Sequence, residues 1–187
     1  MFIDFLTLML INMTAGLVLL AWYVYRGLDD PDQAKWAPAF AVPGLVALLC
    51  GLRMAWVWPL PGVYNAAFGD TSVLLGVLFA GAAWSIATKR DLMPLCVYAF
   101  FAGVAGVLVG VRIIDLHLTL QPILSGVGFI LTGSAGVFAG FTLWQRRSKL
   151  IRATGSVVLV VAAAIWALTG YLGYWGHLAM FDKWVPK

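Results

Sequence analysis

Six long apolar segments are the feature that most constrains the fold of this chain. They cover residues 5–25, 37–60, 71–88, 92–114, 122–144 and 154–176. A helix needs about 20 apolar residues to cross roughly 30 Å of hydrocarbon, and each segment is near that length. No alternation of apolar and polar residues, which would indicate strands, competes with this pattern. The sequence therefore predicts an all-α, polytopic membrane protein, a single domain of residues 1–187 with six transmembrane helices.

Composition agrees with this class and excludes others. Of 187 residues, 63% are apolar and 11% are charged, and the mean hydropathy is +0.94. Soluble domains have roughly 45–50% apolar and about 25% charged residues. The net charge of +4 comes from short connections between the segments. No basic patch is interleaved with stacking aromatic residues, so we do not expect nucleic acid as a partner.

Lysine and arginine gather in three alternate connections. Arg26 and Lys35 lie in the first, and Lys89 and Arg90 lie in the third. The fifth contains Arg146, Arg147, Lys149 and Arg152. Because cytoplasmic loops of membrane proteins are enriched in these cations, we expect the three connections to face the cytoplasm and both termini to lie on the outer face. The predicted location is the cytoplasmic membrane of a bacterium or archaeon.

The stretch GLRMAWVWPLPGVYNAAFGD, residues 51–70, places an arginine inside an apolar segment. Arg53 lies roughly 10 Å below the predicted outer boundary, given the rise per residue of a helix. A charge in a membrane costs up to about 2.5–3.5 kcal/mol on insertion scales and normally faces the bundle interior with a partner. We therefore expect Arg53 to lie inside the bundle against Asp4 or Asp70. In the alternative, its side chain extends to the lipid headgroups.

A second arginine, Arg112, lies in GVRIIDLH near the outer end of the fourth segment. Asp115 follows three residues later on the same helical face, so the two can form an ion pair. These charges and the nearby aromatic residues predict an outward-facing vestibule that binds a small polar molecule or an ion. Its predicted substrate-binding residues are Asp4, Arg53, Trp56, Trp58, Tyr64, Asn65, Asp70, Arg112 and Asp115. The alternative is an ordinary interfacial belt of aromatic and polar side chains, including Tyr171, Tyr174, Trp175 and Trp184.

Metal and haem binding would depend on two histidines, His117 and His177. Both are predicted on the outer side, which is the minimum for one haem b, or for copper with Met180 as a further ligand. Asp115 or Asp182 could orient a ligating imidazole. However, His117 falls in a predicted loop and no CxxCH motif occurs. We therefore predict no metal and no cofactor, and keep haem b or copper as the less favoured alternative.

Enzymatic motifs do not appear in this sequence. The chain has no glutamate, no HExxH, no phosphate-binding Walker loop and no nucleophile elbow, which disfavours an enzyme. Cys50 and Cys96 are predicted at depths that differ by roughly 14 Å, beyond the reach of a disulfide of about 7 Å. We expect both to be free thiols.

Small residues recur at four-residue spacing in two neighbouring segments. Ala102, Gly106 and Gly110 lie in the fourth, and Thr132, Gly136 and Gly140 lie in the fifth. Such ridges allow helix backbones to approach closely in a membrane. They predict either a contact between these two helices or a seam for an oligomer.

Two stretches carry a resemblance to known families. WPLPGVYNAAFGD at 58–70, with the opening IDFLTLMLINMTAGL, resembles an uncharacterised family of small six-span prokaryotic membrane proteins known as a domain of unknown function. In length, span count and outward termini the chain is also similar to the proton-gated urea channel and amide transporter family. The glutamate-containing filters of that family have no counterpart here.

Together these features favour a small-solute channel or transporter, embedded in the lipid bilayer as a homo-oligomer or as a subunit of a larger complex. Two alternatives remain. One is a non-catalytic accessory subunit that packs against a larger membrane enzyme through its glycine faces. The other is a membrane cytochrome with a single haem.

Overall fold

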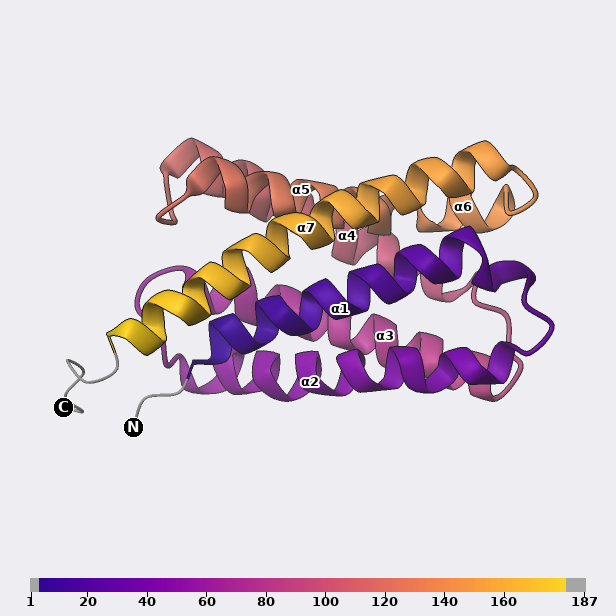
Figure 1. The fold of residues 1–187 in the computed structure, drawn as a ribbon, viewed down its shortest axis with the longest axis horizontal. Helices are drawn as coiled ribbons and strands as arrows, with labels where there is room; N and C mark the ends of the chain where they lie inside the picture. Colours follow the sequence, from indigo (N-terminus) through magenta and orange to yellow (C-terminus); the bar gives the residue numbers. More distant parts are fainter. Residues whose placement is uncertain (1–3, 181–187) are drawn as a thin grey trace.

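The computed structural model describes residues 4–180, and throughout this part of the chain the regular structure is helical. The helices are α1 (Phe5–Tyr25), α2 (Trp36–Val57), α3 (Thr71–Ala87), α4 (Leu95–Leu116), α5 (Pro122–Val137), α6 (Ala139–Trp144) and α7 (Lys149–Ala179) (Figure 1). Three short elements join them: the 3₁₀ turns η1 (Gly27–Asp29) and η2 (Gln33–Lys35), and the π-helix η3 (Asn65–Asp70). The prediction of an all-α membrane protein is confirmed.

Five stretches of helix are long and apolar enough to cross a membrane. They are Phe5–Tyr25, Gln33–Val57, Asn65–Ala87, Leu95–Leu116 and Lys149–Ala179. The predicted segment 122–144 differs, because it divides at Phe138 into α5, with 16 residues, and the short α6. The count of six membrane crossings therefore depends on α5 and α6 together.

Local chemistry explains where these helices begin and end. The carboxylate of Asp4 accepts a hydrogen bond from the backbone N–H of Thr7 at 3.1 Å and caps α1. The hydroxyl of Ser148 caps α7 in the same way, so this helix begins before the predicted residue 154. Trp58 and His117 end α2 and α4 in the left-handed conformation, each with a φ of 51°.

The six long helices are arranged as a closed ring. The most extensive packing occurs in three antiparallel pairs, α1 with α7, α2 with α3 and α4 with α5. Contacts of α1 with α2, α3 with α4 and α5 with α7 join the pairs. A ring of this kind encloses an axis that runs between its two ends.

Glycine makes the closest of these pairs possible. A Cβ atom added at Gly136 of α5 would lie 2.8 Å from the carbonyl oxygen of Ala99 on α4, and one at Gly110 would lie 2.6 Å from that of Gly126. Gly103 and Gly133 meet in the same way. The predicted contact between these helices is confirmed. Because the glycine faces pack against each other, they are not available as a seam for another protein.

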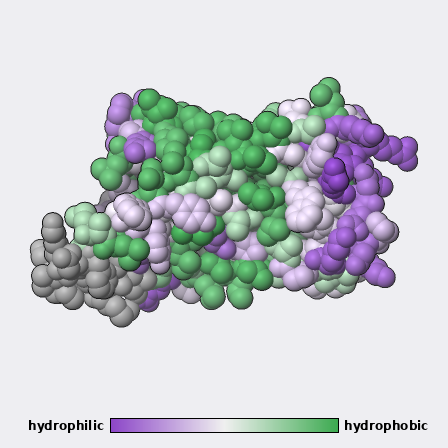
Figure 2. Space-filling model, in the orientation of Figure 1, coloured by the Kyte–Doolittle hydropathy of each residue, from purple (hydrophilic) through white to green (hydrophobic). Residues whose placement is uncertain are grey.

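The two ends of the ring differ in charge. The connections α1–α2, α3–α4 and α6–α7 all lie at one end, where polar residues gather on the surface (Figure 2). We call this the basic end, because the cations of the three connections lie there. The start of α1, the α2–α3 and α4–α5 connections and the end of α7 lie at the opposite end.

Candidate functional site

A cavity of about 760 Å³ occupies the half of the ring nearer the basic end. All six long helices and α6 contribute to its wall. Representative wall residues are Leu17, Leu78, Ala102, Ala135, Leu143 and Val158. No charged side chain lines the cavity in the part of the chain that the structure describes. The interior of the ring is therefore hollow and apolar on this side.

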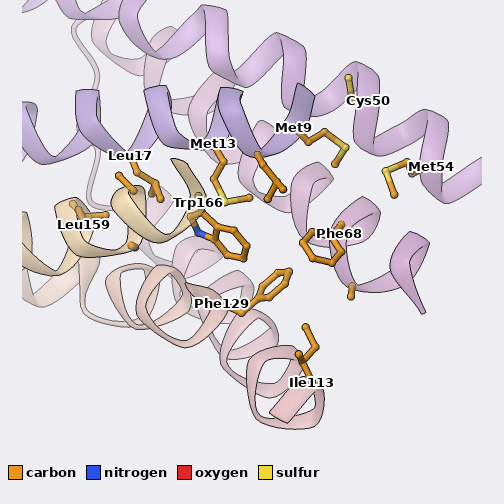
Figure 3. Close-up of a cluster of buried hydrophobic side chains, with 14 of the residues drawn as sticks. Met9, Met13, Leu17, Cys50, Met54, Phe68, Ile113, Phe129, Leu159 and Trp166 are labelled. Carbon is orange, nitrogen blue, oxygen red and sulfur yellow. The ribbon is translucent and has the colours of Figure 1, made fainter. Parts of the chain in front are cut away.

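Three aromatic rings from different elements pack together at one boundary of the cavity, and two of them, Phe129 and Trp166, belong to its wall. Phe68 of η3, Phe129 of α5 and Trp166 of α7 lie against one another (Figure 3). The ring centroid of Phe129 lies 5.0 Å from that of Phe68 and 5.1 Å from that of Trp166, in edge-to-face contacts. All three are buried. We call Phe68, Phe129 and Trp166 the aromatic plug.

Sulfur-containing and aliphatic side chains seal the plug on its remaining sides. Met9, Met13 and Leu17 approach from α1, and Cys50 and Met54 belong to α2 (Figure 3). Met54 is fully buried. Because Met side chains are flexible, they fill irregular gaps around the rigid rings. Cys50, predicted as a free thiol, is free and buried, and Cys96 is also free.

Trp166 is held by a short chain of hydrogen bonds. Its Nε1 donates to the hydroxyl of Thr132 at 3.0 Å, and that hydroxyl donates to the carbonyl of Gly128 at 2.8 Å. A Cβ at Gly128 would lie 2.9 Å from the indole ring. Glycine at this position thus lets the indole lie directly against α5.

Phe68 is carried by the π-helix η3, a form that is rare and often found at functional sites. Asn65 begins this element and is completely buried. Its side-chain carbonyl accepts from the backbone N–H of Leu60 at 3.1 Å, and its amide donates to the carbonyl of the same residue. Asn65 therefore fixes the turn after α2 and, through it, the position of Phe68.

Two predicted binding residues adjoin the plug. Tyr64 stacks on Phe68 with a centroid distance of 6.1 Å, and Asn65 anchors the same element. The buried Asn65 uses its side chain on Leu60, which is a structural role. Tyr64 is half-buried and belongs to the α2–α3 connection, at the end of the ring opposite the basic end.

The prediction that Arg53 lies inside the bundle is wrong. Arg53 is exposed on the outer surface of α2, on the same face as Leu49 and Trp56. Within residues 4–180 it forms no ion pair, with Asp4, Asp70 or any other carboxylate. The depth of Arg53 along α2 follows from counting residues, but the face that points inward is set by packing against α1 and α3.

Two tryptophans predicted as binding residues of the same vestibule also lie outside the ring. Trp56 is 78% exposed and Trp58 is 53% exposed. Asp70, at the end of η3, is exposed as well. These side chains surround the outside of the α2–α3 hairpin and do not enclose a shared pocket with Arg53.

Asp4 has two different partners. Its carboxylate binds Nδ1 of His177 at the end of α7, and the hydroxyl of Thr7 lies 3.4 Å from the same nitrogen. Burial alone would raise the pKa of Asp4, but hydrogen bonds from His177 and Thr7 outweigh this effect and hold it below its usual value of 3.8. Asp4 thus joins the ends of α1 and α7 at the end opposite the basic one.

The remaining predicted charges behave as expected from their spacing. Arg112 and Asp115 form an ion pair at 2.7 Å, confirming the predicted pairing, and both are exposed. His117 and Met180 are exposed at the ends of α4 and α7. Within the described residues, no three histidine, cysteine or acidic side chains are grouped as metal ligands. Asp182 and Trp184 lie outside the described residues.

One buried cation was not predicted. The side chain of Arg152, in the first turn of α7, is only 7% exposed, and it binds Asp29 and the backbone carbonyls of Val24 and Tyr25. The sequence places Arg152 beside three other cations in the run QRRSKLIR, where nothing distinguishes it. The aromatic plug was missed for a similar reason, because its three residues are far apart in a chain rich in aromatic residues.

Comparisons with known proteins agree with this architecture. The structure is similar to that of the Helicobacter pylori urea channel in its closed state, with a TM-score of 0.69 and 17% sequence identity over 96% of this chain and 100% of that one. No curated protein sequence matches the chain. The family described as protein of unknown function (DUF981) matches residues 1–180, which confirms the resemblance seen in the sequence. This chain therefore belongs to the DUF981 family.

Proposed function

We propose that this protein is a channel or transporter that passes a small uncharged solute along the axis of the helical ring. The observation that carries the proposal is the arrangement of the cavity and the aromatic plug. The cavity opens half of the axis, and Phe68, Phe129 and Trp166 occupy its continuation. Displacement of these rings would join the cavity to the opposite end, where Tyr64 lies on the approach.

An uncharged solute fits the wall best. A charged group moved from water into an apolar environment without a partner carries a large desolvation cost, and the cavity wall offers no charged partner among the described residues. The similar solved structure is that of a urea channel, but at 17% identity this likeness shows the fold alone. Urea and other small amides are accordingly the first solutes to test.

The proposal includes a placement in the membrane. α5 and α6 together make the sixth crossing, and the basic end faces the cytoplasm because cations are enriched on that side of membrane proteins. Both termini then lie outside. We propose the prokaryotic cytoplasmic membrane as the location. The outward Arg53, a charge that lipid tails would leave without a polar partner, supports a homo-oligomer or a larger complex.

Solute flux into vesicles tests the proposed path. Purified protein is reconstituted into liposomes, and urea, acetamide and an ionic solute are compared by light scattering after osmotic shock. We expect Phe129→Ala, which removes the central ring of the plug, to raise the flux of the neutral solutes several-fold. Phe68→Ala, which truncates another ring, is a second plug variant.

The control is Trp56→Ala, which removes a larger aromatic side chain from the exposed outer surface of the helices and should leave the flux unchanged. Circular dichroism and size-exclusion chromatography identify variants that do not fold. Equal flux through protein-free vesicles, the wild type and both folded plug variants would contradict the proposal. Selective passage of the ionic solute would contradict the assignment of an uncharged substrate.

A further inference from the structure

The cavity inside the ring is suited to an apolar ligand. Its volume of about 760 Å³ falls within the roughly 300–1,000 Å³ of sites that bind small molecules. The hydroxyls of Thr71, Thr132 and Thr142 belong to its wall, but each donates to a carbonyl of its own helical segment. Tyr23, Ser134 and Thr154 add three further hydroxyls, so polar side chains are few in a wall that is otherwise mostly aliphatic and aromatic.

The wall is most exposed at one place. Phe138 directly precedes α6 and Phe141 lies within it. Leu150 and Thr154 lie near the start of α7. All four line the cavity and are exposed. The cavity therefore communicates with the surroundings beside the α6–α7 connection, at the basic end.

Three cations lie at this mouth. Arg146 and Arg147 precede α7, and Lys149 is its first residue, directly before the wall residue Leu150. All three are exposed, and their side chains form no ion pair within residues 4–180. An apolar cavity that opens beside unpaired cations matches a molecule with a long apolar chain and an anionic head.

We propose that the cavity binds one acyl chain of an anionic phospholipid from the leaflet at the basic end. The chain lies among the aliphatic residues of the wall, and the phosphate binds Arg146, Arg147 and Lys149. Anionic lipids are attracted to such basic segments at the membrane surface. If the proposed function holds, the bound acyl chain occupies the half of the solute path nearer the basic end. The lipid site itself does not depend on the proposed function.

Two glycines of α7 provide a matched pair of variants. Gly155 lines the cavity, and a Cβ there would meet its nearest atoms only at 3.9 Å. Gly176 lies near the other end of the same helix, and a Cβ there would meet nothing within 4 Å. Gly155→Phe places a ring in the cavity, whereas Gly176→Phe places the same ring outside it.

Native mass spectrometry measures the binding directly. The full chain is reconstituted in vesicles of phosphatidylglycerol and phosphatidylcholine, extracted in mild detergent, and weighed with the lipid it retains. We expect the wild type and Gly176→Phe to retain one phosphatidylglycerol per chain and Gly155→Phe to lose it. The combined variant Arg146→Gln, Arg147→Gln and Lys149→Gln should retain phosphatidylglycerol no better than phosphatidylcholine.

Three results would overturn the lipid site. They are a wild-type protein that retains no phospholipid, equal retention by folded Gly155→Phe, and an unchanged preference for phosphatidylglycerol in the combined charge variant. Equal retention by Gly155→Phe would place the lipid on the outer surface of the ring. This experiment measures bound lipid and does not measure solute flux. Its failure would therefore not contradict the proposed solute path, which the flux experiment tests separately.

Discussion

The buried guanidinium of Arg152 reaches from the start of α7 to the carboxylate of Asp29, on the connection between α1 and α2. The side chain of Asp29 is 70% exposed, so burial in this pair falls almost entirely on the arginine. Nε of Arg152 also donates to the carbonyl of Val24 at 2.8 Å. Arg152 therefore binds the last backbone carbonyls of α1 and links the start of α7 to the α1–α2 connection.

We expect Arg152→Gln to lower the free energy of unfolding by about 1–3 kcal/mol, because hydrogen bonds from a buried charged group to the backbone carbonyls of Val24 and Tyr25 are lost. Arg147→Gln, in the same connection but exposed, should change it by less than about 0.5 kcal/mol. Thermal unfolding in detergent measures both. Equal melting temperatures for the two variants would show that the contacts of Arg152 contribute no net stability.

The glycine contacts of α4 predict a graded series of alanine variants. A Cβ at Gly103 would overlap the backbone at Gly133 and Val137, whereas one at Gly106 would lie 3.3 Å from Cα of Gly133. Gly103→Ala should therefore destabilise the protein more than Gly106→Ala. Gly155→Ala, whose Cβ would make only ordinary van der Waals contacts at 3.9 Å, should stabilise α7 by roughly 0.5–1 kcal/mol through helix propensity. A melting temperature of Gly103→Ala at or above that of Gly106→Ala would contradict the packing of α4 on α5.

Removal of the buried Asn65 side chain tests what holds the π-helix. Asn65→Ala leaves the backbone N–H and carbonyl of Leu60 without these partners, and we expect a loss of about 1–3 kcal/mol. Gln121→Ala, at an exposed position in the α4–α5 connection, is the control. If Phe68 depends on this anchor, Asn65→Ala should also raise solute flux. Unchanged stability and flux would assign the position of Phe68 to packing alone.

The contact between Asp4 and His177 predicts an acid-dependent loss of stability. The pKa of Asp4 is lower in the folded protein than its usual value of 3.8, so its ionised form stabilises the fold. This contribution is complete above about pH 4 and is lost as the pH falls through the lowered pKa. Asp4→Asn should therefore melt below the wild type at pH 5, and the difference should shrink toward pH 3. A difference that does not depend on pH would contradict an ionic role for Asp4.

The helices could be predicted from the sequence because membrane-crossing length is a local property. The segment predicted at 71–88 is α3 to within one residue, and the one predicted at 5–25 is α1. The predicted helix ends were wrong where a local backbone feature, and not hydropathy, ends or divides a helix. Pro59 follows the left-handed Trp58 and ends α2 before residue 60, and Phe138 divides the segment 122–144.

The site could not be predicted because it depends on which helical face turns inward. Arg53 and Arg152 are both arginines at helix positions, yet packing exposes the first and buries the second. Apolar residues surround most positions of every segment, so the sequence carries no amphipathic signal that separates the lumen from the lipid. A cavity is a space that side chains leave empty, and no residue pattern records it.

Membrane orientation is the last prediction, and it follows from the distribution of cations between the two ends. In a background of Cys50→Ala and Cys96→Ala, single cysteines are introduced at Gln121 and Arg147, which are exposed in connections at opposite ends. Because the basic end is expected in the cytoplasm, a membrane-impermeant maleimide added to intact cells should label Gln121→Cys. Arg147→Cys should react only after the membrane is permeabilised. The reverse pattern would invert the orientation, and labelling of both in intact cells would show that the two connections lie on one side, which a ring of six crossings does not allow.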